Sequence, residues 1–345
     1  MDSAEEEYRQ LEKMERRFKE WIMADVWTAA FFVEKTEHDL EFYPTNATLE
    51  SIRENQPVRQ VLIENVLRIA DQYNFFHYHL EFPEVFEKGG FDCLLGNPPW
   101  EQIQLEEKAY FEGKINFEGK KGNERKEIIH NLKMTNPDLN EKYILDLRFY
   151  NISNHFFEQS NRYDLVTEGR NNTYSLFTYL AYQIINHLGI VGYIVPTGIS
   201  TDFGNRFFFQ FLVENKKIIS IIDFENRRAL FKDVEANMRF TLLSISKSRH
   251  EHLKLAFGLI EPEQLNEIHR FYNLTSDEFF LFNPNTKTCP VFKTSIESNI
   301  AKKIYSNFPI LINELNPENP FNIQFKQGLF NMTTDSNYFH KKEEL

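Results

Sequence analysis

Four short apolar runs constrain the fold of this chain more than any other feature of its sequence. Each is about five to eight residues long and is bounded by polar or turn-forming residues, which is typical of buried strands; they occupy residues 91–95, 190–196, 218–223 and 239–246. Apolar stripes with helical periodicity lie between them, over 172–188 and 204–215. Strands that alternate with helices predict an α/β fold in which helices cover a mostly parallel sheet.

The segments on either side of these runs have a different pattern. Apolar residues recur every three or four positions over 4–30, and a second helix is expected over 57–72 with Pro57 in its first turn. Gly189 is expected to end the helix over 172–188, since glycine is common just past a helix. The chain then divides into an N-terminal helical segment (1–74), an α/β unit (75–250) and a less regular C-terminal extension (251–345) with a helix over 262–272.

Composition limits the setting in which such a chain works. No apolar stretch is long enough for a transmembrane helix, and the acidic beginning MDSAEEEYRQ does not resemble a secretory signal. Only two cysteines occur, so we expect a reducing, cytoplasmic location. The net charge of −12 argues against a chain whose main task is to grip phosphate backbones.

One segment departs from this acidic balance. Residues 114–133 are rich in lysine and arginine, and three glycines lie in or beside them (Gly113, Gly119 and Gly122). We expect a mobile loop here. Two interpretations remain open: a solvated loop, or a clamp that folds onto DNA.

The sharpest local signal is Asn97-Pro98-Pro99-Trp100, which follows the apolar run 91–95. Ligands of open α/β sheets bind just past the carboxyl ends of strands. Two successive prolines remove backbone donors, so carbonyls there act only as acceptors, and the Asn97 side-chain oxygen adds another. With the planar Trp100 beside them, these groups can hold an aromatic ring that bears an NH2 group. A rigid strand-end turn without a ligand is the alternative.

The segment resembles the amino-methyltransferases, whose catalytic motif is (Asn/Asp/Ser)-Pro-Pro-aromatic. The resemblance runs over about residues 75–247 and is closest to the type IIG-like, adenine-specific N6 DNA methyltransferases of restriction–modification and phage-defence systems. LEFPEVFEKGGFDCLLGNPPW, NTYSLFTYLAYQIINHLGIVGYIVPTG and LFKDVEANMRFTLLSIS are similar to three motifs of that group, in the same order. The resemblance implies a partial Rossmann-like class I methyltransferase core that transfers a methyl group from S-adenosylmethionine to adenine in double-stranded DNA.

The resemblance also implies roles for individual residues. Asn97 and the Pro98 carbonyl would bind the adenine amine, and Pro99 would keep the turn rigid. Trp100 would stack on the flipped base and Phe231 would pack against it from another side. Glu81 and Phe82 stand where the family holds the cofactor adenine, although the family usually has Asp at the first position; Asn97 would border the cofactor too.

One family motif is missing. The glycine-rich cofactor loop, of the form Asp/Glu/Ala-x-Phe/Pro-x-Gly-x-Gly, has no counterpart upstream of residue 75. We therefore expect the middle portion of a methyltransferase, weak or inactive alone and competent with a partner chain that supplies this half; a truncated chain, a split gene product and a degraded gene all remain open. A target recognition domain normally follows the core, and residues 320–345 are similar to the approach to it.

Two other functions remain open. The same motif serves methylation of RNA amino groups and of protein glutamine, and a vestigial motif in a non-catalytic interaction subunit would also lack the glycine loop. His77 and His79 lie on one face of a strand-like run, but no cysteine or clear third ligand is near, so no metal site is expected.

Overall fold

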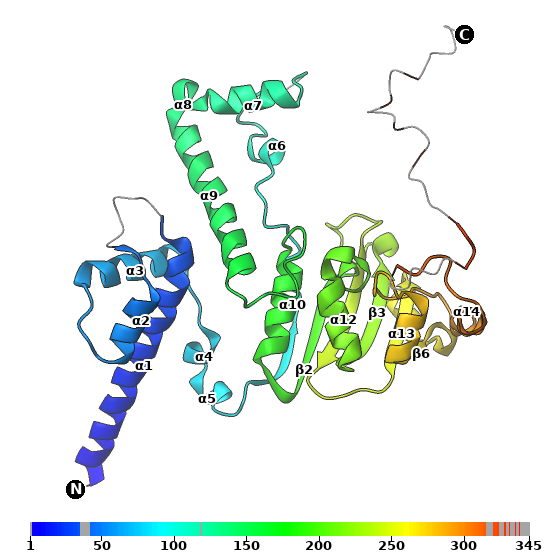
Figure 1. The fold of residues 1–345 in the computed structure, drawn as a ribbon, viewed down its shortest axis with the longest axis horizontal. Coiled ribbons are helices and arrows are strands. Elements are labelled where there is room, and N and C mark those ends of the chain that lie inside the picture. The colour runs from blue at the N-terminus through cyan, green and yellow to red at the C-terminus, as the bar shows by residue number, and fades with distance from the viewer. Residues whose placement is uncertain are drawn as a thin grey trace.

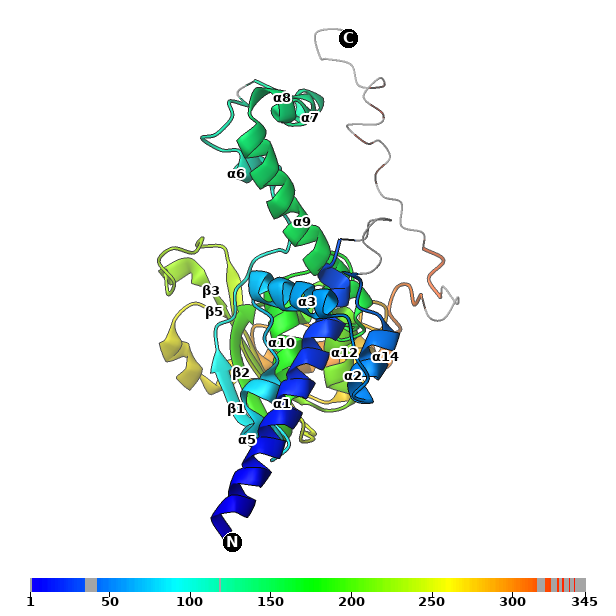
Figure 2. The same cartoon turned by 90° about the vertical axis from the view of Figure 1, so that its left-hand side faces the viewer.

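The computed structural model describes residues 2–34, 42–117, 119–314, 320–323, 328, 331, 335 and 338, with side chains from Met14 onward. A central sheet lies between an N-terminal group of helices and the C-terminal segment, and a helical arm projects away from it (Figures 1 and 2). None of the described helices is both long and apolar enough to cross a membrane.

The sheet has six strands in the order β1-β2-β4-β3-β5-β6. The pairs β1–β2 and β3–β5 are parallel, whereas the other three are antiparallel, so the α/β class is confirmed but the expectation of a mostly parallel sheet is wrong. Residues 226–238 join β3 to β4 without a covering α-helix, and the chain therefore returns antiparallel. The strands are β1 (Phe91–Gly96), β2 (Ile185–Pro196), β3 (Ile218–Glu225), β4 (Arg239–Ser246), β5 (Leu253–Leu259) and β6 (Tyr272–Leu274).

All four apolar runs predicted as strands lie in strands, but one helix boundary was wrong. The helix α10 (Thr173–Ile184) ends four residues earlier than expected, and β2 begins at Ile185. Gly189 lies inside β2 rather than ending a helix; a Cβ there would be 2.6 Å from the Phe91 carbonyl oxygen of β1. A short apolar run fits both periodicities, so the pattern could not place this boundary.

One face of the sheet carries the main hydrophobic core. The helices α10, α12 (Arg206–Glu214) and α13 (Ser276–Phe282) lie together against it (Figure 1). The helix predicted over 204–215 is confirmed, with a 3-10 turn (Phe203–Asn205) before it. The side chains that fill this core are aliphatic and aromatic, among them Val191, Val195, Phe208, Leu212, Ile221, Leu243 and Phe257.

The opposite face is open near β1. Leu95 is 80% exposed and Ile190 42%, and Cys93 is also exposed. β1 is an edge strand that pairs only with β2 among the described residues. Among the described residues, a small cluster covers this face near the carboxyl ends of β3 and β5 and the amino end of β4, and Trp100 and Phe231 pack against it: Phe224, Phe240, Ala256 and Leu259.

The N-terminal helices form a small core of their own. Val26 of α1 packs with Val66 of α3, and Phe156 of the arm lies against them. Met14 and Phe18 of the predicted α1 stripe are about two-thirds exposed. Pro57 precedes α3 rather than lying in its first turn. The helices are α1 (Asp2–Phe32), α2 (Asn46–Arg53) and α3 (Gln60–Tyr73).

The expected mobile loop over 114–133 is instead the outer part of a folded arm, residues 104–159. Phe111, Ile129, Leu132 and Tyr143 form its buried core. The sequence did not reveal this core, because its apolar residues are few and their spacing follows neither a helical nor a strand period. The arm's helices are α6 (Glu107–Tyr110), α7 (Gly122–His130), α8 (Leu132–Thr135) and α9 (Pro137–Gln159).

The expected helix over 262–272 is also wrong. Two 3-10 turns, Pro262–Asn266 and Ile268–Arg270, lead into β6, and α13 and α14 (Ser295–Asn307) follow. Most of 320–345 lies outside the described residues. The prediction that this segment leads to a target recognition domain therefore concerns residues that the structure does not describe.

Gly90 lies in the turn just before β1, and a substitution there tests how closely this turn packs on the start of β2. Its φ is +119°, and a Cβ would overlap the Ile184 carbonyl oxygen and lie 2.9 Å from the Ile185 carbonyl carbon. We expect Gly90→Ala to lower the free energy of unfolding by about 2–4 kcal/mol in denaturant titration. Gly113 has φ +71° with nothing within 4 Å, so Gly113→Ala should cost only about 1 kcal/mol. Equal losses of unfolding free energy in the two variants would contradict the close packing of Gly90 on the backbone of Ile184 and Ile185.

Candidate functional site

Asn97-Pro98-Pro99-Trp100 leaves the carboxyl end of β1, beside the carboxyl end of the parallel strand β2. Asn97 and Pro99 are exposed, whereas Pro98 and Trp100 are half-buried. The amide of Asn97 is thus open to a ligand. The turn stands at the edge of the sheet where ligands of α/β folds bind.

Aromatic side chains hold Trp100 at this edge. Its indole Nε1 donates to the Ile194 carbonyl oxygen at 3.3 Å. Phe231 meets it edge to face with ring centroids 6.2 Å apart, and Phe240 lies nearly parallel at 6.4 Å. Trp100 and Phe231 are 131 positions apart, and the structure brings them together as the motif resemblance implied.

Thr173, the first residue of α10, fixes the chain that follows the motif. Its hydroxyl donates to the Pro99 carbonyl oxygen at 2.7 Å and accepts from the Glu101 amide at 3.0 Å. The Thr173 amide donates to the Glu101 carbonyl oxygen at 2.9 Å. Among the described residues the Pro98 carbonyl accepts no hydrogen bond, so it remains an available acceptor beside Asn97.

Asn226 fixes the loop that carries Phe231. Its side chain is fully buried; Nδ2 donates to the Phe231 and Val234 carbonyl oxygens, both at 2.8 Å, and Oδ1 accepts from the Phe231 amide at 2.9 Å. It begins the 3-10 turn Asn226–Arg228, which ends at Ala229 in the left-handed region (φ 51°). This residue escaped the sequence analysis because one polar residue after a strand has no distinctive pattern.

Asp223, near the end of β3, joins three other elements. Its carboxylate is completely buried and accepts from the Thr197 hydroxyl, from Arg239 Nη2 at 2.6 Å and from the Gly258 amide at 2.9 Å. These partners lie at the ends of β2, β4 and β5. A buried charge requires such partners, and here they align the strand ends that border the site.

A third buried polar residue, Asn205, holds the loop after β2. Asn205 donates to the Gly198 carbonyl oxygen at 2.9 Å and to the Tyr174 hydroxyl at 3.1 Å, and accepts from Ser175 Oγ. Burial raises the pKa of Tyr174, which therefore stays neutral. Gly198 begins the short helix α11 (Gly198–Thr201) where the loop leaves β2.

The structure does not bring Glu81 and Phe82 to this edge. Glu81 is the last residue of α4 (Tyr78–Glu81), and Phe82 lies between α4 and α5 (Pro83–Phe86). The Phe82 ring lies 5.5 Å from that of Phe91, at the opposite end of β1 from Asn97. Both side chains are exposed.

The two histidines lie apart from the motif as well. His77 precedes a helix rather than lying in a strand-like run, and its Nε2 is 2.8 Å from Asp25 Oδ1 in a buried pair. Burial, with His77 and Arg162 nearby, lowers the pKa of His79. Among the described residues, no three His, Cys, Asp or Glu side chains gather where they could hold a metal ion.

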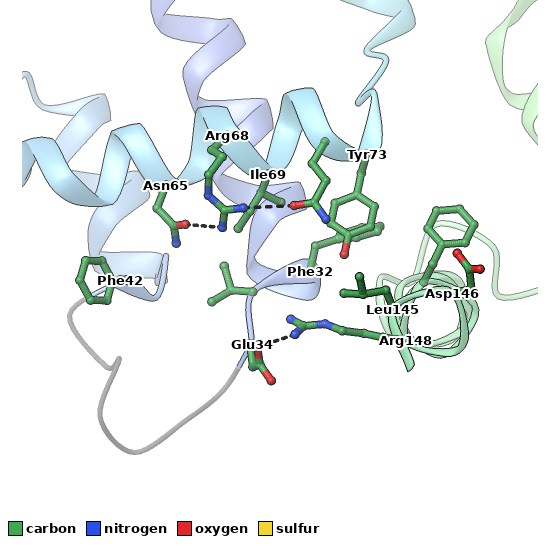
Figure 3. A pocket seen from close by; sticks show the side chains of 13 residues that line it. Phe32, Glu34, Phe42, Asn65, Arg68, Ile69, Tyr73, Leu145, Asp146 and Arg148 are labelled. Atoms are coloured by element: carbon green, nitrogen blue, oxygen red, sulfur yellow. Dashed lines mark hydrogen bonds and ion pairs between the residues drawn. The ribbon is translucent and has the colours of Figure 1, made fainter. Parts of the chain in front are cut away.

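A cavity of about 640 Å³ lies away from the motif, between α1, α3 and α9 (Figure 3). Arg148 of the arm pairs with Glu34 at 2.5 Å, and Phe149 stacks on Tyr73 with centroids 6.0 Å apart. This cavity marks where the arm rests on the N-terminal helices. Its walls contain none of the predicted site residues.

The residues present do not complete a pocket for S-adenosylmethionine. Asn97 stands at the right edge, but Glu81 and Phe82 are at the other end of the strand, and the sheet face beside Leu95 is open to solvent. What the described residues do form is an acceptor-rich turn backed by aromatic rings, which suits the amine and ring of a substrate.

Comparison with known proteins places this arrangement in a family. Residues 19–135 and 139–231, more than half of the chain, match the model of the Eco57I restriction-modification methylases. The chain belongs to that family, so the resemblance to methyltransferases of restriction–modification systems is confirmed. No curated protein shows a significant match to the chain.

Solved structures show weaker similarity. The type I restriction-modification methyltransferase subunit from Streptococcus thermophilus is 12% identical, with a TM-score of 0.30, over 39% of this chain and 33% of that one. The ATP-dependent type ISP restriction-modification enzyme LlaBIII, solved bound to DNA, is 12% identical with a TM-score of 0.29, over 65% of this chain and 14% of that one. The chain therefore spans only a third or less of these two proteins.

Asn226 provides a test of the site's construction. We expect Asn226→Ala to remove the side-chain partner of the Phe231 amide and of the Val234 carbonyl, at about 1–3 kcal/mol for each group left unsatisfied, whereas the Phe231 carbonyl still accepts from the Val234 amide. Hydrogen exchange in 231–235 should then become faster by about tenfold or more, with less change in β2. Asn215→Ala is the control, since Asn215 is exposed and bonds only the Phe211 carbonyl. Unchanged exchange at 231–235 would show that Asn226 does not hold the loop.

Proposed function

We propose that this chain supplies the base-binding half of an adenine-specific DNA methyltransferase, which transfers a methyl group from S-adenosylmethionine to the N6 amine of a flipped adenine. The single observation that carries the proposal is the exposed Asn97 amide and the Pro98 carbonyl beside Trp100, which packs against the adjoining rings of Phe231 and Phe240. Family membership supports methylation in a restriction–modification setting.

The proposed chemistry follows from this geometry. The Asn97 side-chain oxygen and the Pro98 carbonyl accept the two amine hydrogens, which raises electron density on the nitrogen and stabilises positive charge as it becomes tetrahedral. Trp100 offers a ring face, and a base inside a duplex must leave the stack to reach it. Bound S-adenosylmethionine would supply the electrophilic methyl group, so the residues of this chain would mainly orient the amine.

Asn97 is the residue whose loss should matter most. We expect Asn97→Ala to lower methyl transfer to DNA by at least about 100-fold, because an acceptor at the developing charge is removed. Asn97→Asp keeps an acceptor and should retain measurably more activity. The assay is transfer of labelled methyl from S-adenosylmethionine to unmethylated duplex DNA, run with the products of adjoining genes present and with folding checked by circular dichroism.

Parallel reactions with RNA and with protein as methyl acceptors separate the substrates. Label in N6-methyladenine supports the proposal, and label in RNA or in protein glutamine would replace it with one of the alternatives. Equal activity of Asn97→Ala and the wild-type chain would remove Asn97 from the reaction.

We further propose that the cofactor half is supplied by a partner chain that carries a glycine-rich loop. β1 is an edge strand, and the sheet face at Cys93, Leu95 and Ile190 is exposed. An apolar strand edge of this kind is a template for pairing with another chain. The alternative, a non-catalytic interaction subunit with a vestigial motif, rests on the same open edge and on the missing glycine loop.

Calorimetry can distinguish these possibilities. We expect the chain alone to bind S-adenosylmethionine weakly or not at all, and binding to appear when the products of adjoining genes are added. Leu95→Lys should reduce this partner-dependent binding, since it puts a charge on the open face. Ile268→Lys is the control, because Ile268 is 87% exposed in a 3-10 turn far from β1. Tight binding by the chain alone would contradict the partner, and no binding in any mixture would favour the vestigial subunit.

A further inference from the structure

The tip of the arm, residues 114–133, is the strongest positive feature of an acidic chain. It carries six lysines or arginines against three glutamates, whereas the whole chain has a net charge of −12. Five of the six cations are exposed, and no ion pair joins any of the six to a carboxylate of the described residues. The cations are Lys114, Lys120, Lys121, Arg125, Lys126 and Lys133.

The arm is rigidly folded rather than loose. Phe111 and Tyr143 lie 4.9 Å apart in its core, and Tyr143 donates to Glu107 at 3.1 Å. Lys114 lies 4.0 Å above the Tyr110 ring. The helices α7 and α8 therefore present their cations from a fixed surface, which a solvated loop would not do.

The arm is rooted at the rim of the candidate site. The Ile103 amide donates to the Asn171 carbonyl oxygen at 2.9 Å, and Asn154 of α9 donates to the Ile103 carbonyl oxygen at 2.8 Å. Asn171 in turn donates to Asn154 Oδ1 at 2.8 Å. The arm thus begins four residues after Trp100, and near its other end Asn154 is bonded to Asn171, two residues before Thr173.

The length of the arm sets its reach. α9 has 23 residues, which at about 1.5 Å per residue gives about 35 Å. Figures 1 and 2 both show α7 and α8 at the far end of α9, away from the sheet. One turn of duplex DNA is also about 34–36 Å long. A cationic tip at this distance can contact phosphates about one helical turn from a base held at Trp100.

We propose that the arm tip is a sequence-independent contact for the phosphate backbone of duplex DNA, placed to hold the duplex beside the site. This deepens the proposed function and rests on DNA being the substrate. The acidic remainder of the chain repels a polyanion, so the tip decides where a duplex can approach.

The test is fluorescence anisotropy of the full chain with a labelled duplex, from about 50 to about 200 mM salt. We expect the triple variant Lys120→Glu, Lys126→Glu and Lys133→Glu to weaken binding about 100-fold or more at low salt. It should also reduce the salt slope by about 2.7, or about 0.9 for each lost phosphate contact. The matched control is Lys88→Glu, Lys293→Glu and Lys303→Glu, which makes the same charge change at exposed lysines outside the arm.

Each outcome decides the matter. Weak binding by the arm variant with near-normal binding by the control supports the proposal. Equal losses in the two variants would show that only net charge matters, and no binding by the wild-type chain at low salt would also overturn it. Since this assay contains no S-adenosylmethionine, a failure of methyl transfer leaves its result unaffected. If the chain transfers methyl groups to DNA but the arm variant binds duplex DNA as well as the wild type does, the proposed function stands and the arm is not a DNA contact.

Discussion

The buried carboxylate of Asp223 is the interaction on which the rest of the structure depends. It accepts hydrogen bonds from Thr197, Arg239 and Gly258, at the ends of β2, β4 and β5, and none of its surface reaches solvent. Because Asp223 is completely buried, while Arg239 is 38% exposed, loss of its partners would leave the carboxylate charge without compensation inside the protein. The strand ends that border the candidate site are therefore held in one arrangement.

The loops around those strand ends use the same kind of construction. Thr173 holds the turn after Asn97-Pro98-Pro99, Asn205 holds the loop after β2, and Asn226 holds the loop that carries Phe231. Each uses side-chain hydrogen bonds to backbone groups, which fixes loop shape without a bound ligand. The acceptors and the aromatic rings are thus brought to one edge before any substrate arrives, which lowers the entropic cost of binding.

The sequence could predict the parts of the fold that repeat a local pattern. The four apolar runs became strands because continuous burial requires continuous apolar residues, and the motif at 97–100 was found because two prolines after a strand are distinctive. Strand direction could not be predicted, since it depends on the connection between β3 and β4. The folded arm was missed because Phe111 and Tyr143 meet only after the chain has turned back on itself.

The candidate site shows the same division. Trp100 and Phe231 could be paired through a family resemblance, whereas Asn226, Asp223 and Thr173 are single polar residues whose importance comes only from burial and partners. Glu81 and Phe82 were placed by their order in a motif, and the observed helices α4 and α5 put them at the other end of β1. Order along a chain does not determine which end of a strand a residue faces.

The central claim is that Trp100 binds an unpaired adenine at this edge. The chain has three tryptophans, so the double variant Trp21→Phe and Trp27→Phe retains only Trp100. The fluorescence of Trp100 can then be followed as duplex DNA is added. A duplex with one extrahelical adenine spares most of the unstacking energy, and the same duplex with an abasic site there is the control. We predict quenching by the first duplex and little by the second. Equal quenching by both, or by neither, would contradict the account.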